Sequence, residues 1–258
     1  MRAPGVPDAA AAPGVSAASG RRARFGGLDT VRGVAIAWMV SFHFCFDLNW
    51  FGYAHFDFYR SPWWLDQRIA IVSLFLLCAG LSQAWGDARV RTAAAFWKRW
   101  AQIFGCGLLV AVGSYQAFPA SFIYFGILQG VAAMLLLHRY LGRRLGGWIL
   151  LLVPLLLLAP SLWGNAAFDG RWLNWTGLIA HKPITEDYVP LLPWYGVFAL
   201  GAGIGALLRR DDFRLLARLP TLRPLAWLGR HPLTVYMVHQ PVLIGALWLV
   251  TKALGAMP

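Results

Sequence analysis

Long runs of apolar residues, broken by few or no charges, dominate this sequence. A helix needs about 20 consecutive, mostly apolar residues to cross the hydrocarbon core of a bilayer. Hydrophobic residues make up 59% of the chain and charged residues 13%, whereas soluble domains average about 45–50% and about 25%. The sequence therefore predicts an all-α membrane protein, a polytopic bundle of about seven transmembrane helices. The seven predicted spans are residues 31–50, 69–85, 100–118, 122–138, 148–163, 194–208 and 233–254.

The chain divides into a short polar tail and one membrane domain. Residues 1–24 are rich in Ala, Pro, Gly and Ser and end in a basic cluster, with no apolar segment before that cluster. This composition is typical of a disordered tail and differs from a cleaved signal peptide. We expect residues 1–24 to be a disordered cytosolic tail and residues 25–258 to form the transmembrane domain.

Basic residues fix the predicted orientation. The net charge is +12, but the Lys and Arg residues lie in short loops between apolar runs, where they set topology and do not form a nucleic-acid surface. All but five of the 23 Lys and Arg residues fall on one side if the predicted spans alternate. The exceptions are Arg60, Arg68, Arg171, Lys182 and Lys252. The positive-inside rule then predicts a cytosolic N-terminus and, with seven spans, a C-terminus on the periplasmic side.

Nucleotide hydrolysis and zinc chemistry have no support in the sequence. It contains no phosphate-binding glycine loop, no dinucleotide fingerprint and no H-E-x-x-H pair. The three cysteines, Cys45, Cys78 and Cys106, lie inside apolar runs without metal-ligand spacing. We interpret them as small packing residues and expect no metal.

Four ionisable residues of the first predicted helix share one face. On a helical wheel Asp29, Arg32, His43 and Asp47 fall within an arc of about 60°. Ionisable groups in a bilayer usually face the bundle interior or a wet cavity, so this stripe should point inward. Asp47 lies one turn beyond His43, and a carboxylate bonded to an imidazole prepares a general base. The alternative for Asp29 and Arg32 is a surface pair at the cytosolic end.

Two further segments combine polar groups with prolines. In the last predicted helix Tyr236, His239 and Gln240 adjoin Pro241, which should kink the helix. His239 is either part of a functional site or a structural residue that packs between helices. The outer segment 187–194 contains Asp187, Tyr188 and Trp194. This segment is either an interfacial anchor or a lid that binds a polar substrate.

Four segments resemble the bacterial membrane proteins of the heparan-α-glucosaminide N-acetyltransferase catalytic-domain-like family, a group of transmembrane acyltransferases. They are LDTVRGVAIAWMVSFHFCFDL (28–48), FIYFGILQG (122–130), DYVPLLPWYGVFALG (187–201) and LGRHPLTVYMVHQPVL (228–243). The resemblance implies a protein of the bacterial inner membrane that transfers acetyl from cytosolic acetyl-CoA to an amino or hydroxyl group of a glycan or amino-sugar acceptor on the periplasmic side. Membrane lipids are the other expected partners, and a homo-oligomer is compatible with the resemblance.

The resemblance also implies roles for particular residues. His43 is the expected active histidine, with Asp47 and His239 beside it in the catalytic group, and His55 is its rival. Acetyl-CoA is expected to meet residues of the first, fourth and last helices, and the acceptor to meet the outer segment. The expected acetyl-CoA residues are Asp29, Arg32, Gln129, Tyr236 and Gln240, and the expected acceptor residues are Asp187, Tyr188 and Trp194. Gln129 stands where the family pattern has a histidine, and a glutamine cannot take a proton at neutral pH.

Two other functions fit the same residues. A transporter or flippase for a sugar or lipid would use buried ionisable residues as a relay, although the chain lacks the paired repeats of many transporters. A non-catalytic membrane subunit would use the polar stripe only to lock helices together.

Overall fold

The computed structural model describes residues 25–88 and 92–255, and these residues form helices and loops without a strand. The predicted tail, residues 1–24, lies outside the described residues. The helices are α1 (Gly26–Trp50), α2 (Pro62–Ala88), α3 (Ala93–Ala117), α4 (Ile127–Leu137), α5 (Arg143–Leu145), α6 (Val153–Trp163), α7 (Leu191–Leu208), α8 (Arg214–Ala217), α9 (Arg223–Arg230) and α10 (Pro232–Ala253). The all-α membrane fold predicted from the apolar runs is confirmed.

The predicted number of about seven spans is not confirmed. Within the described residues, five helical stretches are long and apolar enough to cross a membrane: Gly26–Trp50, Pro62–Gly86, Ile127–Trp163, Leu191–Asp211 and Pro232–Ala253. The predicted spans 122–138 and 148–163 belong to the third of these stretches, in which α4, a π-helical turn, α5, a 3₁₀ segment and α6 follow one another. The predicted span 100–118 lies in α3 except for its last residue, and α3 is not among the five.

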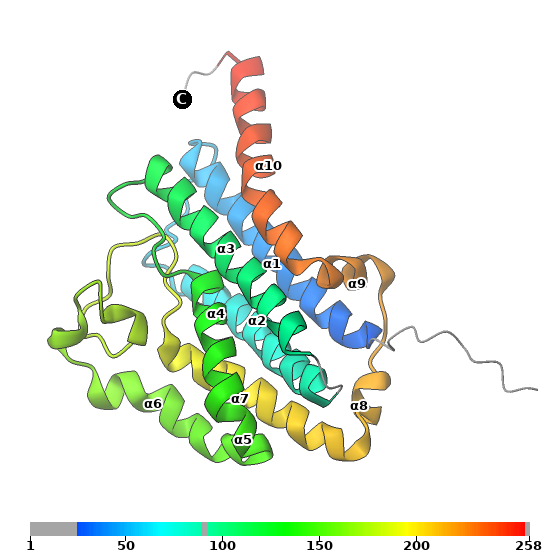
Figure 1. Cartoon of the computed structure of the whole chain (residues 1–258). Coiled ribbons are helices and arrows are strands. Elements are labelled where there is room, and N and C mark those ends of the chain that lie inside the picture. The colour runs from blue at the N-terminus through cyan, green and yellow to red at the C-terminus, as the bar shows by residue number, and fades with distance from the viewer. Residues whose placement is uncertain (1–24, 89–91, 256–258) are drawn as a thin grey trace, which may run out of the picture.

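The change of direction between α4 and α6 comes from a glycine. Figure 1 shows α4 and α6 running in different directions on either side of α5. Gly146 follows α5 with φ of +53°, a left-handed backbone conformation that glycine adopts at little steric cost. The basic segment around Arg139, Arg143 and Arg144 separates the predicted spans 122–138 and 148–163 at this place.

Helices α2 and α7 pack so closely that only glycine fits at their contact. A Cβ atom on Gly80 would collide with the carbonyl oxygen of Phe198, and one on Gly201 would collide with that of Leu77. Small residues of this kind let membrane helices approach backbone to backbone. Phe198 is completely buried and belongs to a core that α7 shares with α2, α3 and α4.

Helix α9 is attached to the first turns of α1 in the same way. Cβ atoms on Gly33 of α1 and Gly229 of α9 would collide with the backbone of the opposite helix. The side chain of Arg32 adds polar bonds at this contact, because its Nη1 donates to the Gly229 carbonyl oxygen over 2.9 Å. This attachment places the start of α10, which follows α9 directly, beside α1 (Figure 1).

Candidate functional site

A large cavity lies between α1, α2, α3, α4 and α10 and is bordered by the loop that precedes α7. Its volume is about 770 Å³, within the range of roughly 300–1,000 Å³ for ligand sites. Most of the lining is aliphatic or aromatic, and the polar groups gather in a few places. This combination of an apolar wall and a few polar groups is typical of a small-molecule site.

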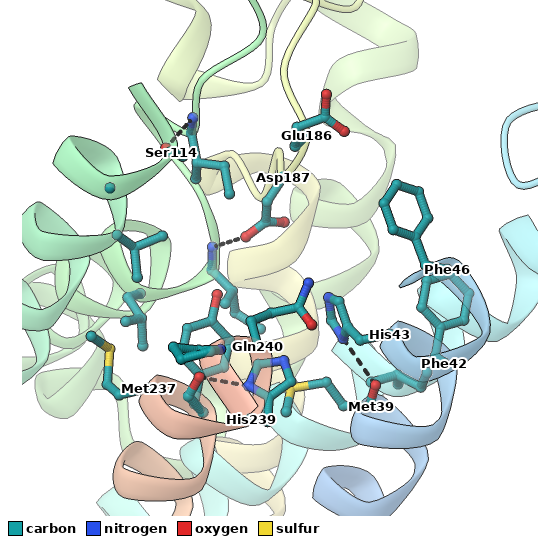
Figure 2. Close-up of a pocket in the computed structure, with 18 of the residues that line it drawn as sticks. Met39, Phe42, His43, Phe46, Ser114, Glu186, Asp187, Met237, His239 and Gln240 are labelled. Carbon is teal, nitrogen blue, oxygen red and sulfur yellow. Dashed lines mark hydrogen bonds between the residues drawn. The ribbon is translucent and has the colours of Figure 1, made fainter. Parts of the chain in front are cut away.

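Two histidines from different helices meet in the cavity wall. His43 of α1 and His239 of α10 have ring centroids 4.9 Å apart, with the rings inclined at 70°. Figure 2 shows the two imidazoles facing one another beside Gln240. The first and last long helices, almost 200 residues apart in sequence, are thus both needed to form this pair.

Backbone carbonyls orient both imidazoles. Nδ1 of His43 lies 2.9 Å from the carbonyl oxygen of Met39, and Nδ1 of His239 lies 2.7 Å from that of Tyr236. A carbonyl oxygen only accepts, so each Nδ1 carries the proton and each neutral ring keeps its lone pair on Nε2. Nε2 of His239 is buried and has no hydrogen-bond partner among the described residues. The arrangement therefore supplies a nitrogen that can accept a proton inside the cavity.

Asp47 is completely buried and accepts a hydrogen bond from Gln240. Nε2 of Gln240 donates to Oδ1 of Asp47 over 3.3 Å, which joins α1 to α10. The hydrogen bond expected between Asp47 and His43 is not among those of the described residues, because Nδ1 of His43 turns back to Met39 instead. Asp47 does not line the cavity, whereas Gln240 does. The Oε1 atom of Gln240 has no hydrogen-bond partner in the described part of the chain.

Charged groups line the end of the cavity at the loop before α7. Oδ2 of Asp187 accepts a hydrogen bond from the backbone N–H of Ile127, the first residue of α4, over 2.8 Å. Desolvation raises the pKa of the Asp187 carboxyl, although the Ile127 N–H and the nearby Arg68 and Lys182 oppose this shift. Figure 2 shows Asp187 between the histidines and Glu186.

Glu186 is held at the same end by two hydroxyl groups. Its Oε1 accepts from Ser121 over 2.6 Å and its Oε2 accepts from Tyr59 over 3.3 Å. Desolvation, with the negative charge of Glu186, raises the pKa of the Tyr59 hydroxyl. Glu186, in the loop before α7, and Arg68, near the start of α2, both line the cavity. Both were missed from the sequence, because no spacing in it ties them to His43.

The other end of the cavity carries a basic residue. Arg99 lies in the second turn of α3 and lines the cavity, on the side where the positive-inside rule puts most basic residues. The sequence predicted the side of the membrane on which Arg99 lies, but it did not predict that Arg99 lines the cavity. The cavity therefore extends from Arg99 near the start of α3 past the two histidines to the charged groups Arg68, Glu186 and Asp187.

Besides Asp47, five more residues expected in the site lie outside the cavity wall and have other partners. Asp29 and Arg32 form an ion pair of 2.8 Å, and Arg32 also bonds to Ser82 and Gly229. The side chain of Gln129 bridges the Gly107 carbonyl oxygen and the Gly126 N–H at the start of α4. The remaining two are Tyr188, whose hydroxyl donates to the Asn174 carbonyl oxygen over 2.6 Å, and Trp194, which packs against the core.

The remaining expectations concern His55, Tyr236 and metals. His55 is exposed in the loop between α1 and α2 and does not line the cavity, whereas Tyr236 does. Within residues 25–88 and 92–255, no three His, Cys, Asp or Glu side chains gather in a way that could hold a metal ion.

Comparison with known proteins places the chain in a family. The model of the family described as heparan-α-glucosaminide N-acetyltransferase, catalytic, matches residues 24–241. No curated protein and no solved structure gives a significant match. The matched region contains all of α1 to α9 and the part of α10 that bears His239 and Gln240. The chain therefore belongs to the heparan-α-glucosaminide N-acetyltransferase catalytic family, a family of membrane acetyltransferases.

Proposed function

We propose that the protein transfers the acetyl group of acetyl-CoA to an amino or hydroxyl group of a sugar-type acceptor, with His43 as the general base. The observation that carries this proposal is the pair of facing imidazoles in one cavity. Both rings have their protons held on Nδ1 by backbone carbonyls, which frees Nε2 for proton transfer. His55 lacks such surroundings, which supports His43 over its rival.

The transfer proceeds by attack of the acceptor on the thioester. The acceptor nitrogen or oxygen forms a bond to the carbonyl carbon of the acetyl group while the bond from that carbon to sulfur breaks. Nε2 of His43 takes the proton that the acceptor loses, and the resulting imidazolium returns it to the departing thiolate. His239, 4.9 Å away between ring centroids, lies against the same reacting groups, and Gln240 offers an unpartnered oxygen beside them.

The two substrates enter from opposite ends of the cavity in this proposal. The basic end at Arg99 suits the phosphates of CoA, because guanidinium groups bind phosphate by charge-assisted hydrogen bonds. The end at Asp187 and Glu186 suits an amine or a hydroxyl-rich sugar. Arg32, already paired with Asp29, joins α1 to α2 and α9 and does not contact the donor.

The orientation of the protein follows from its basic side. With the N-terminus in the cytosol of a bacterial inner membrane, the Arg99 end of the cavity faces the pool of acetyl-CoA and the Asp187 end faces the periplasm. The acetyl group then crosses part of the bilayer through the cavity.

The proposal is tested with purified protein in nanodiscs, labelled acetyl-CoA and a panel of amino sugars. We expect saturable release of CoA together with an acetylated product. Movement of a sugar across vesicles without use of acetyl-CoA would contradict the enzyme and favour a transporter. The matched pair His43→Ala and His55→Ala separates the expected base from the exposed histidine of the first loop.

A further inference from the structure

The cavity has an apolar arm between the outer halves of α3 and α10. Three residues of α3 at a spacing of four, Leu109, Gly113 and Ala117, form one side of this arm, and α10 contributes Gly245 and Trp248 to the other. Leu109 is 65% exposed and Trp248 is 48% exposed. Because α10 is long and apolar enough to cross a membrane, we place this exposed apolar surface against lipid hydrocarbon.

Two glycines keep the arm open. A Cβ atom on Gly113 or on Gly245 would meet no other atom within 4 Å. At Gly80 and Gly201, by contrast, the backbone of a neighbouring helix occupies the space where a Cβ atom would lie. Figure 1 shows the C-terminal part of α10 extending beyond the neighbouring helices. The opening between α3 and α10 is therefore an apolar groove that faces the bilayer.

The groove is continuous with the reacting centre, because its residues line the same cavity as His43 and Asp187. A molecule that fills this cavity meets polar groups at one end and hydrocarbon surface at the other. The pantetheine arm of CoA is rich in amides, and these would lose their hydrogen bonds in such a groove. A hydrocarbon chain has no hydrogen-bonding groups to lose, so it can lie in such a groove without this cost.

We infer that the acceptor is lipid-borne: its amino or hydroxyl head group reaches His43 and Asp187 while its hydrocarbon chain lies in the groove between α3 and α10. Such an acceptor enters sideways from the bilayer, so its chain never has to pass through water. The acetyl-transfer part of this inference rests on the proposed function. The occupation of the groove by a hydrocarbon chain does not depend on that function.

Occupation of the groove is tested with dodecyl glucosaminide that carries a diazirine near the end of its chain. The wild-type protein in phosphatidylcholine–phosphatidylglycerol nanodiscs is irradiated with this probe, and the labelled peptides are identified. We expect labels in residues 109–117 and 244–248. Gly113→Leu places a side chain in the volume that the chain of the probe would occupy, and this overpacking should lower the labelling about tenfold. Gly245→Leu fills the groove from the opposite wall and should lower the labelling to a similar extent.

The matched control is Gly105→Leu. Gly105 also lies in α3, and a Cβ atom there also meets nothing within 4 Å, but Gly105 does not line the cavity. This variant should be labelled like the wild type. Undiminished labelling in both Gly113→Leu and Gly245→Leu, or labels that fall outside the two segments, would overturn the inference.

Acetyl transfer separates this inference from the proposed function. We expect kcat/KM for dodecyl glucosaminide to exceed that for glucosamine, and Gly113→Leu to lower the ratio of the two about tenfold. A ratio near one in the wild-type protein would overturn the lipid-borne acceptor and leave the proposed function standing. Groove-dependent labelling without acetylation of either compound would overturn the proposed function and leave the groove standing as a chain-binding site.

Discussion

The two cavity histidines owe their orientation to carbonyl groups of their own helices. Met39 lies one turn before His43, and Tyr236 lies three residues before His239, so each helix fixes its own imidazole. The helical wheel predicted correctly that Asp47, which is buried, points inward. The wheel could not predict the partner of Asp47, because that depends on Gln240 from a helix almost 200 residues away.

The carboxyl group of Asp187 should give acceptor binding a dependence on pH. Its pKa is raised by desolvation above the ordinary value of 3.8, so the group takes up a proton at a higher pH than an exposed aspartate. An ammonium group binds only to the ionised form. We expect KM for an amine acceptor to be constant above the raised pKa and to increase as the pH falls through it. KM is determined from initial rates measured at a series of pH values from 4 to 8.

Substitution of Asp187 tests the assignment of that dependence. Asp187→Asn should raise KM for the amine about tenfold or more near neutral pH, in line with the loss of a hydrogen bond between charged groups. It should also remove the increase of KM at acidic pH. The control is Asp66→Asn, because Asp66 is exposed in the first turns of α2 and does not line the cavity. An acidic increase of KM that persists in Asp187→Asn would assign the titration to another group.

At the scale of helices, the apolar runs predicted positions well and connections less well. The predicted spans 31–50, 69–85 and 194–208 all fall inside single helices, α1, α2 and α7. The predicted span 122–138 begins too early, since residues 122–126 form a loop whose Gly126 N–H is bonded by Gln129. The close approach of α9 to α1 depends on a contact between distant segments, which leaves no periodic signal in the sequence.

The contact between α1 and α9 should tolerate no side chain at Gly33. A Cβ atom there collides with the backbone of Leu225, so Gly33→Ala must push α9 away from α1. Overpacking of this kind typically costs about 1–3 kcal/mol. We expect a lower Tm in detergent and weaker acetyl transfer, because α9 leads directly into the helix that bears His239.

Gly105→Ala is the matched control for this stability prediction. The same substitution on α3 meets no atom within 4 Å and replaces a helical glycine by a better helix former. Its Tm should equal or exceed that of the wild type. Equal values of Tm for Gly33→Ala and Gly105→Ala would contradict the close α1–α9 contact.

For the whole molecule, contacts at the helix ends relate the start of α1 to the end of α10. Thr30, in the first turns of α1, accepts a hydrogen bond from the N–H of Leu222, just before α9. Tyr53, beyond the end of α1, bonds to Thr251 at the end of α10 over 2.8 Å. The start of α1 and the end of α10 thus lie at opposite ends of the bundle.

Labelling of single cysteines tests which end faces the cytosol. In a background without Cys45, Cys78 and Cys106, we expect Ala54→Cys and Ala180→Cys to react with an impermeant maleimide added to intact cells from the periplasmic side. Arg218→Cys, in the basic segment after α8, should react only after the membrane is opened. Reaction of Arg218→Cys in intact cells, without reaction at Ala54→Cys, would reverse the orientation and with it the proposed entry of acetyl-CoA.

The most direct test of the central claim is the rate of acetyl transfer by His43→Ala, measured beside His55→Ala under saturating acetyl-CoA. If His43 is the base, His43→Ala should lower kcat by about 10²–10⁴, the usual contribution of general-base catalysis, while acetyl-CoA still binds. His55→Ala should retain the wild-type rate, because His55 is exposed outside the cavity. A wild-type rate in His43→Ala would contradict the mechanism, and loss of activity in His55→Ala alone would move the active histidine to the first outer loop.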